Sequence, residues 1–223
     1  MLLGAAKYLA ETRNFDGTAV MIFQPAEEGG GGGREMCRDG MMDRWNIQEV
    51  YGMHNGPGIP VGEFAIRPGA LMASADEFEI VVTGKGGHAA EPAAAVDTTL
   101  VAAQILVSLQ SIVSRNVKQI ARVVLTVGTL ETDSNASNVI AHTVRMTGTV
   151  RTLDNNNREL AERRIREFAT HTALAFGATA EVIWAACYQV TVNHDRETEV
   201  VVEAADTVGG KEDVDGTGER SAP

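Results

Sequence analysis

The sequence predicts an α/β protein that carries a smaller inserted α+β domain, and three observations support this prediction. Two short apolar runs, residues 17–25 and 47–55, each stop at a polar or Gly/Pro-rich stretch, as buried strands do. From about residue 74 an alternating pattern replaces them and gives the order β-α-β-β-α-β. A helical pattern then returns after residue 187. We therefore assign residues 1–73 and 187–223 to a partial α/β domain, and residues 74–186 to the inserted domain.

Composition narrows the class of partner. The chain has 223 residues, 44% hydrophobic and 22% charged, which suits one or two globular domains with a real core. Its net charge is −11 and no run of Lys or Arg offsets it, so we expect no nucleic-acid or membrane partner. No apolar run approaches the roughly 20 residues of a membrane span, and the N-terminus does not read as a signal peptide. Cys37 and Cys187 do not make a disulfide framework, so a cytoplasmic location is expected.

The N-terminal part reads as helices alternating with strands. "MLLGAAKYLAETR" has helical spacing but no capping residue in front of it, so the chain is expected to start inside an element. "GTAVMIFQP" is a nearly continuous apolar run that Pro25 stops, which predicts a strand buried on both faces. "GREMCRDGMM" predicts a short helix, and "IQEVYGMHN" predicts a second buried strand.

The inserted domain is read from four strands and two helices. The strands are predicted in "ADEFEIVVTGKG", "ARVVLTVGTLE", "HTVRMTGTVRT" and "ATAEVIWAA". The helices are predicted over residues 97–114 and in "NNNRELAERRIREFATHTALAFG", which ends at Gly177. This order is the split βαβ, or ferredoxin-like, arrangement, with both helices on one face of a four-stranded antiparallel sheet. The tail from about residue 210 has no apolar pattern and is expected to be disordered.

Two adjacent acids and a histidine follow the predicted N-terminal strands. Glu27 and Glu28 come after the first strand, and His54 ends the second. Open α/β sheets place ligands at the carboxyl ends of their strands. Neighbouring glutamates project in different directions, so one is able to bind a divalent cation while the other takes a proton from water. Imidazole suits a zinc-type site. The alternative is that both acids are solvated loop residues and that His54 caps a strand.

Four motifs carry a resemblance to a known family. "FQPAEEGGGG", "YGMHNGPGIPVG", "GKGGHAAEP" and "SNVIAHTVRMTGTVRT" resemble, in order and spacing, the M20 metallopeptidases, in the branch of hippurate hydrolases and N-acyl-amino-acid amidohydrolases. The resemblance implies a two-metal, aminopeptidase-like α/β catalytic domain with a ferredoxin-like lid that also forms a homodimer. It further implies hydrolysis of the amide bond in hippurate-like or N-acetyl amino acids, with two divalent ions (Zn, Mn, Co or Ni) per site.

The resemblance also implies a role for each matched residue of the catalytic domain. Glu27 corresponds to the general base, and Glu28 and His54 correspond to metal ligands. The glycines after the two acids let the backbone turn sharply without side chains that crowd the metals.

Three residues of the inserted domain match positions that act on the substrate. His88 corresponds to a histidine that reaches the partner subunit's active site and donates to the oxyanion. Asn138 and Arg151 correspond to residues that bind the substrate carboxylate, where an arginine fork suits two oxygens. Without the motifs, His88 reads as a surface-loop histidine, Asn138 as a turn former and Arg151 as an exposed strand residue.

The sequence also departs from the family pattern. It contains neither the H-A-C-G-H-D-x-H type of segment nor the C-terminal G-S-E-D-F stretch and histidine that supply further metal ligands, so a truncated chain is expected. His194 is not counted as a ligand. Two protein ligands are fewer than the three of a catalytic zinc. Two hypotheses follow: a metal-dependent amidohydrolase that is incomplete in this chain, or an inactive fragment whose lid domain serves as a dimerisation or binding module.

Overall fold

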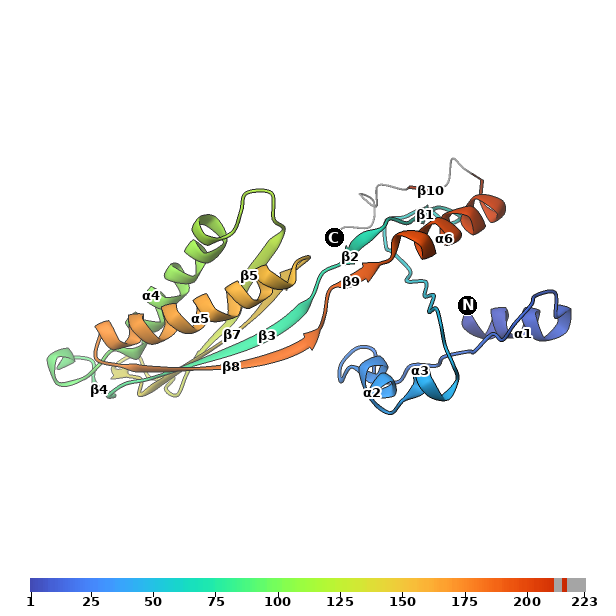
Figure 1. Cartoon of the computed structure of the whole chain (residues 1–223). Coiled ribbons are helices and arrows are strands. Elements are labelled where there is room, and N and C mark those ends of the chain that lie inside the picture. The colour runs from blue at the N-terminus through green and yellow to red at the C-terminus, as the bar shows by residue number, and fades with distance from the viewer. Residues whose placement is uncertain (211–213, 216–223) are drawn as a thin grey trace. The chain divides into compact units, whose positions relative to one another are not determined.

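The computed structural model describes residues 1–210 and 214–215 and divides into two compact units. The first unit is Met1–Asn55 and the second is Gly56–Pro223. Figure 1 shows the elements of both units along the chain. Of the tail predicted to be disordered from about residue 210, only Gly210 and Val214–Asp215 lie within the described residues, and Val214–Asp215 form a short strand instead.

The first unit contains helices and irregular segments, without a sheet. Its helices are α1 (Leu2–Thr12), α2 (Gly32–Arg38) and α3 (Met41–Arg44). The strands predicted for residues 17–25 and 47–55 are wrong, because both segments are irregular. A strand needs a neighbour for its backbone hydrogen bonds, and these runs pair with none. Their apolar side chains stay accessible to solvent, with Phe23 56% and Val50 58% exposed.

The second unit is built around a four-stranded antiparallel sheet with the strand order β5-β7-β3-β8. Its strands and helices follow the predicted order β-α-β-β-α-β. We call these elements the sheet domain. They are β3 (Ala75–Thr83), α4 (Thr98–Ser111), β5 (Val123–Thr132), β7 (Thr143–Thr152), α5 (Asn155–Ala175) and β8 (Thr179–Tyr188).

Both helices of the sheet domain cover the same face of the sheet. Helices α4 and α5 contact each other and both contact β7, and Figure 1 shows them on one side of the strands. Asp97 caps α4 by accepting from two backbone N–H groups, and Asp154 caps α5 by accepting from that of Asn157. A short π-helical turn, η2 (Ile112–Asn116), extends α4.

The hydrophobic core lies between this sheet face and the two helices. Alternate residues of β3 point into it, and Phe78, Ile80 and Val82 are all buried. Ile105 and Ile165 fill it from α4 and α5. The core cluster contains residues from 78 to 182, so it belongs to the sheet domain.

Short elements complete the second unit. Strands of two to four residues form three small ribbons, of which β4–β6 carries His88. They are β1 (Phe64–Ala65) with β10 (Val214–Asp215), β2 (Gly69–Met72) with β9 (Thr191–Asn193), and β4 (Gly87–His88) with β6 (Val139–Ile140). The remaining elements are η1 (Pro92–Ala94) and α6 (Asp195–Val208). Across the described residues, every helix is too short or too polar to cross a membrane.

Candidate functional site

Glu27 and Glu28 lie in an exposed turn that glycines shape. The turn leads into α2, and the backbone takes positive φ angles of 108° at Gly30 and 64° at Gly31. A Cβ at Gly32 would lie 1.7 Å from the carbonyl oxygen of Pro25, so this position accepts glycine alone. The glycine run is therefore explained by chain geometry: the segment folds back on itself and presents both acids at its surface.

Helix α2 adds fixed charges next to this turn. Arg34 and Arg38 both bind the carboxylate of Glu35, at 3.1 and 2.9 Å. The hydrogen bond from Arg34 lowers the pKa of Glu35, with help from the charge of Arg38. Glu35 therefore keeps its charge at neutral pH and neutralises part of the positive charge beside the turn.

The proton position on His54 follows from its backbone contact. His54 is exposed in an irregular segment, and its Nδ1 lies 2.8 Å from the carbonyl oxygen of Asn55. A carbonyl only accepts, so Nδ1 carries the proton of the neutral ring. Nε2 then has a free lone pair, which is able to bind a metal ion or a proton, as in histidines that ligate metals.

The predicted ligands do not complete a metal centre. Glu28 and His54 have donor types that zinc-like ions accept, but two donors fall short of three. In residues 1–210 and 214–215, no three His, Cys, Asp or Glu side chains come together as a group that suits a metal ion. The described residues therefore do not supply the three protein ligands of a catalytic zinc site.

His88 has the opposite proton arrangement. It lies in β4, paired with Val139 of β6, and its Nδ1 accepts a hydrogen bond of 3.2 Å from the backbone N–H of Ala90. The neutral ring therefore carries its proton on Nε2, which becomes a hydrogen-bond donor. A donor of this kind suits an oxyanion.

The loop that carries His88 is held by close backbone packing. A Cβ at Gly86 would lie 2.9 Å from the carbonyl oxygen of Ile140, and one at Gly84 would lie 2.7 Å from the side chain of Thr98. The glycines of the "GKGGH" motif thus let the loop approach β6 and α4. These close approaches fix the backbone path of the segment that leads to His88.

Asn138 is the predicted residue that lies beside His88. Its carbonyl oxygen accepts from the backbone N–H of Ala89 at 3.0 Å, directly next to the β4–β6 pair. The structure thus brings His88 and Asn138 together at one end of the sheet domain, both on exposed positions.

Arg151 lies far from this pair. It is exposed near the end of β7 and pairs with Val124 of β5. Eight residues separate it from Thr143, where β7 begins close to β6, and at ~3.3 Å per residue this is about 26 Å. Within one chain, therefore, Arg151 is not placed to share a small carboxylate with Asn138.

Two residues that the sequence analysis did not identify hold the backbone at the end of the sheet domain where His88 lies. Asp133 accepts from the backbone N–H groups of His142 and Thr143, both at 3.1 Å, and so holds the start of β7. The buried hydroxyl of Thr98 donates to the carbonyl oxygen of Ala141 at 2.7 Å. An aspartate after a strand was the available signal for the first. The second depends on a contact 43 residues away in sequence.

Comparison with known proteins gives the family. The chain matches the model of peptidase family M20/M25/M40 over residues 1–222. It is 40% identical over 205 residues to N-acetyl-L-cysteine deacetylase of Bacillus subtilis, covering 92% of this chain and 49% of that relative. It is 37% identical over 210 residues to hippurate hydrolase of Campylobacter jejuni, covering 94% and 54%.

A solved structure agrees with these relatives. The fold is similar to that of the Bacillus subtilis YXEP protein, described as a dinuclear metal binding peptidase from the M20 family, with a TM-score of 0.74 and 32% identity. The match covers 93% of this chain and 52% of that protein. The chain thus spans about half the length of the relatives it matches. Sequence and fold lead to one assignment: this chain is a member of the M20/M25/M40 peptidase family.

Proposed function

We propose that this chain provides part of a metal-dependent amidohydrolase that cleaves the amide bond of N-acyl amino acids. The structural observation that carries the proposal is the state of His88, whose Nε2–H is free to donate. The relatives named N-acetyl-L-cysteine deacetylase and hippurate hydrolase support this substrate class. Two divalent metal ions, as in the dinuclear relative, are part of the proposal, with ligands beyond Glu28 and His54.

Glu27 is the proposed proton carrier. An amide is cleaved when water adds to the carbonyl carbon and the amine then leaves with a proton. Glu27 takes the proton of the attacking water and returns it to the nitrogen of the leaving amine. Its position in an exposed turn, next to the proposed ligand Glu28, suits a group that contacts both water and substrate.

His88 is the proposed oxyanion donor. When water adds, the carbonyl oxygen becomes negatively charged, and a positioned N–H stabilises it. Loss of one such donor typically lowers kcat by about 10²–10³-fold. We propose that Asn138, next to His88, binds the substrate carboxylate, and that Arg151 contributes to this from another subunit of a homodimer.

A second function is favoured by how unevenly the chain is packed. Residues 1–55 bury only Gly31 and Gly32, whereas the core cluster lies in the sheet domain. In this alternative the sheet domain acts as a dimerisation or binding module, and the chain itself is inactive. Analytical ultracentrifugation of the chain, together with metal analysis, separates the two: a metal-free dimer without hydrolysis favours the module.

A chimera tests the enzymatic proposal. This chain replaces the matching half of the Bacillus subtilis deacetylase, and release of amino acid is measured from N-acetyl amino acids and hippurate with Mn²⁺ or Zn²⁺. We expect turnover. Glu27→Gln should abolish it with metal content nearly unchanged, whereas the matched variant Glu28→Gln should lower both. A folded, metal-loaded chimera that does not hydrolyse these substrates would contradict the proposal.

A further inference from the structure

A basic hollow lies in the second unit, at the N-terminal end of α5. It has a volume of about 720 Å³ and is lined by four cationic side chains: Arg67, Lys118, Arg122 and Arg163. Asp154 is the carboxylate among its lining residues. The lining charge is therefore 4 − 1 = +3, in a chain whose net charge is −11. This local reversal of sign indicates attraction for an anion.

Most of this positive charge is not neutralised by neighbouring acids. Among the described residues, Lys118, Arg122 and Arg67 form no ion pair with a carboxylate. Arg163 lies 3.9 Å from Glu167, beyond hydrogen-bond distance, with its side chain 64% exposed. Three of the four lining cations thus have no carboxylate partner among the described residues, and the fourth, Arg163, has only a long contact with one.

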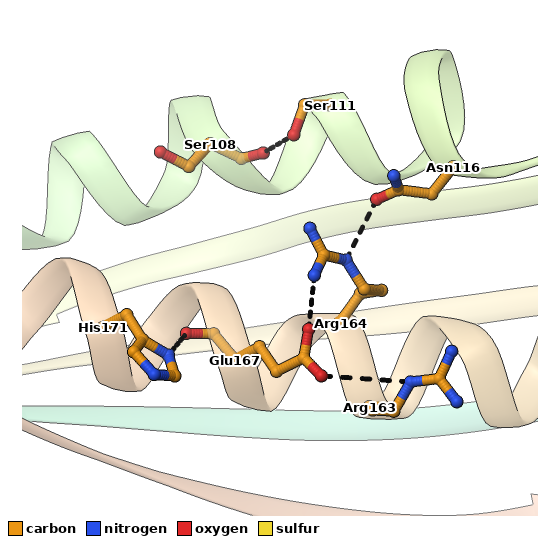
Figure 2. Close-up of polar contacts among 7 residues, drawn as sticks. All are labelled: Ser108, Ser111, Asn116, Arg163, Arg164, Glu167 and His171. Atoms are coloured by element: carbon orange, nitrogen blue, oxygen red, sulfur yellow. Dashed lines mark hydrogen bonds and ion pairs between the residues drawn. The ribbon is translucent and has the colours of Figure 1, made fainter.

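Glu167 is more closely engaged by Arg164 than by Arg163. Figure 2 shows Arg164 between Glu167 and Asn116, with Arg163 on the other side of the same carboxylate. Arg164 Nε donates to the Asn116 side-chain oxygen at 3.1 Å. This contact holds Asn116, another lining residue, against α5 and fixes one wall of the hollow.

Arg67 has an unsatisfied donor in this wall. One of its terminal nitrogens donates to the carbonyl oxygen of Ala70 at 2.5 Å, but its Nε is buried and has no acceptor among the described residues. A buried donor without a partner costs free energy. The oxygen atoms of an anion in the hollow would be acceptors for the Arg67 guanidinium if its side chain turned toward them.

The start of α5 adds to the attraction. The carboxylate of Asp154 accepts from the backbone N–H of Asn157 at 2.9 Å, so it acts as the helix cap. The remaining N–H groups of the first turn have no partner within the helix and carry its positive dipole end. Asn156 and Asn157, both in this turn, line the hollow.

We propose that this hollow binds a small multivalent anion, a phosphate-bearing molecule or a compound with several carboxylates. Arginine forks recognise both groups through paired hydrogen bonds, and the volume is in the range of small-molecule sites. None of the six residues predicted for amide hydrolysis lines the hollow. The site is therefore separate from the proposed reaction. Its ligand joins Arg67, the η2–β5 connection and α5, three segments distant in sequence.

Calorimetric titration with pyrophosphate tests this proposal. The chain is first treated with a chelator, so that bound metal cannot account for the signal, and NaCl keeps the ionic strength constant. We expect saturable binding of one pyrophosphate per chain. The double variant Arg122→Gln/Arg163→Gln should weaken it at least about tenfold, because it removes two charge-assisted contacts. Circular dichroism establishes that the variant is folded.

Arg115→Gln is the matched control. Arg115 is exposed and lies in η2, next to the lining residue Asn116, but it does not line the hollow itself. Its loss should change the affinity by less than about twofold at this ionic strength. Citrate, titrated in parallel, separates carboxylate from phosphate preference. The proposal would be overturned if neither pyrophosphate nor citrate bound saturably. It would also be overturned if Arg115→Gln weakened the binding as much as the double variant does.

Discussion

The buried ion pair between Asp76 and Arg158 gives the sharpest stability prediction. Asp76 lies on the helix-facing side of β3 with no exposed surface, and its two oxygens accept from Arg158 at 2.6 and 2.5 Å. The hydrogen bond with Asp76 raises the pKa of Arg158, although burial opposes this. Asp76→Asn keeps the shape of the side chain but removes the negative charge, and so leaves a guanidinium without its counter-charge.

The expected loss follows from burial. Removal of one partner from a buried pair costs about 3–5 kcal/mol. The Arg158 side chain is 17% exposed, so part of its charge reaches water, and we expect a value near ~3 kcal/mol. At about 4 °C per kcal/mol for a domain of this size, the melting temperature should fall by about 12 °C. Urea unfolding followed by circular dichroism should show a lower midpoint with an unchanged m-value.

The raised pKa of Arg158 also predicts how the stability difference between the wild type and Asp76→Asn depends on pH. The raised pKa of Arg158 means that its stabilisation is fully present below the pKa of an unfolded arginine and is lost only as pH rises through the higher folded pKa. The difference between the wild type and the Asp76→Asn variant should therefore stay constant from about pH 6 to 9, where Arg158 is charged in both states.

Glu79→Gln on the same strand is the matched control. Glu79 pairs with Arg145 on the opposite face of the sheet, where the two side chains are 26% and 51% exposed. Because solvent reaches both members of this pair, we expect it to contribute at most about 1 kcal/mol. Equal losses for Asp76→Asn and Glu79→Gln would refute the reasoning. The double replacement Asp76→Leu/Arg158→Met should regain most of the stability, because it leaves no unpaired charge.

Three further predictions concern packing and catalysis. Gly148→Ala would place a Cβ 2.3 Å from a phenyl carbon on β3 and should cost about 1–3 kcal/mol in urea unfolding, whereas Gly128→Ala, 4.0 Å from its nearest atom, should cost less than 1 kcal/mol. Thr98→Val removes a buried donor to a carbonyl oxygen in the β6–β7 connection and should cost about 1–3 kcal/mol by the same assay. In the chimera, mixing His88→Ala with Glu27→Gln should restore partial hydrolysis. No recovery despite verified subunit exchange would mean that His88 does not act across a dimer.

The sheet domain was predictable because its strands alternate. In β3, residues 78, 80 and 82 are apolar and buried, while the residues between them are polar or half-buried. Such alternation fixes both the strand and the face it buries. The aspartates at 97 and 154 similarly fixed the starts of both helices. Local signals and tertiary packing agree here, so the order of these strands and helices could be predicted from the sequence.

The two strands predicted for the first unit are wrong because local signals and tertiary packing do not agree there. An apolar run such as residues 17–25 indicates only that a segment can be buried, and the burial itself requires neighbouring strands and helices. In this structure Phe23 and Val50 have no such neighbours and remain more than half exposed. The sharp turn expected at the glycines after the two acids is present at Gly30 and Gly31, because such a turn depends on local backbone geometry.

The basic hollow and the histidine protons depend on contacts that the sequence does not display. Its four cations lie at positions 67, 118, 122 and 163, so no window of sequence contains a basic cluster. Folding brings them together around the start of α5. The proton of His88 is likewise set by the backbone N–H of Ala90, and that of His54 by the carbonyl of Asn55. Sequence motifs identify these histidines as candidates, but the neighbouring backbone groups determine which ring nitrogen carries the proton.

The two histidines also show how the proposed chemistry divides between the units. His54 offers a lone pair from a unit that buries no large side chain, whereas His88 offers a proton from a loop packed against a complete core. A donor to an oxyanion must be held in place before the charge develops, since catalysis of this kind depends on preorganisation. A metal ligand is under a weaker requirement, because metal binding itself contributes free energy to ordering its ligands. The histidine on the packed loop therefore suits the oxyanion, and the histidine in the exposed irregular segment suits a metal.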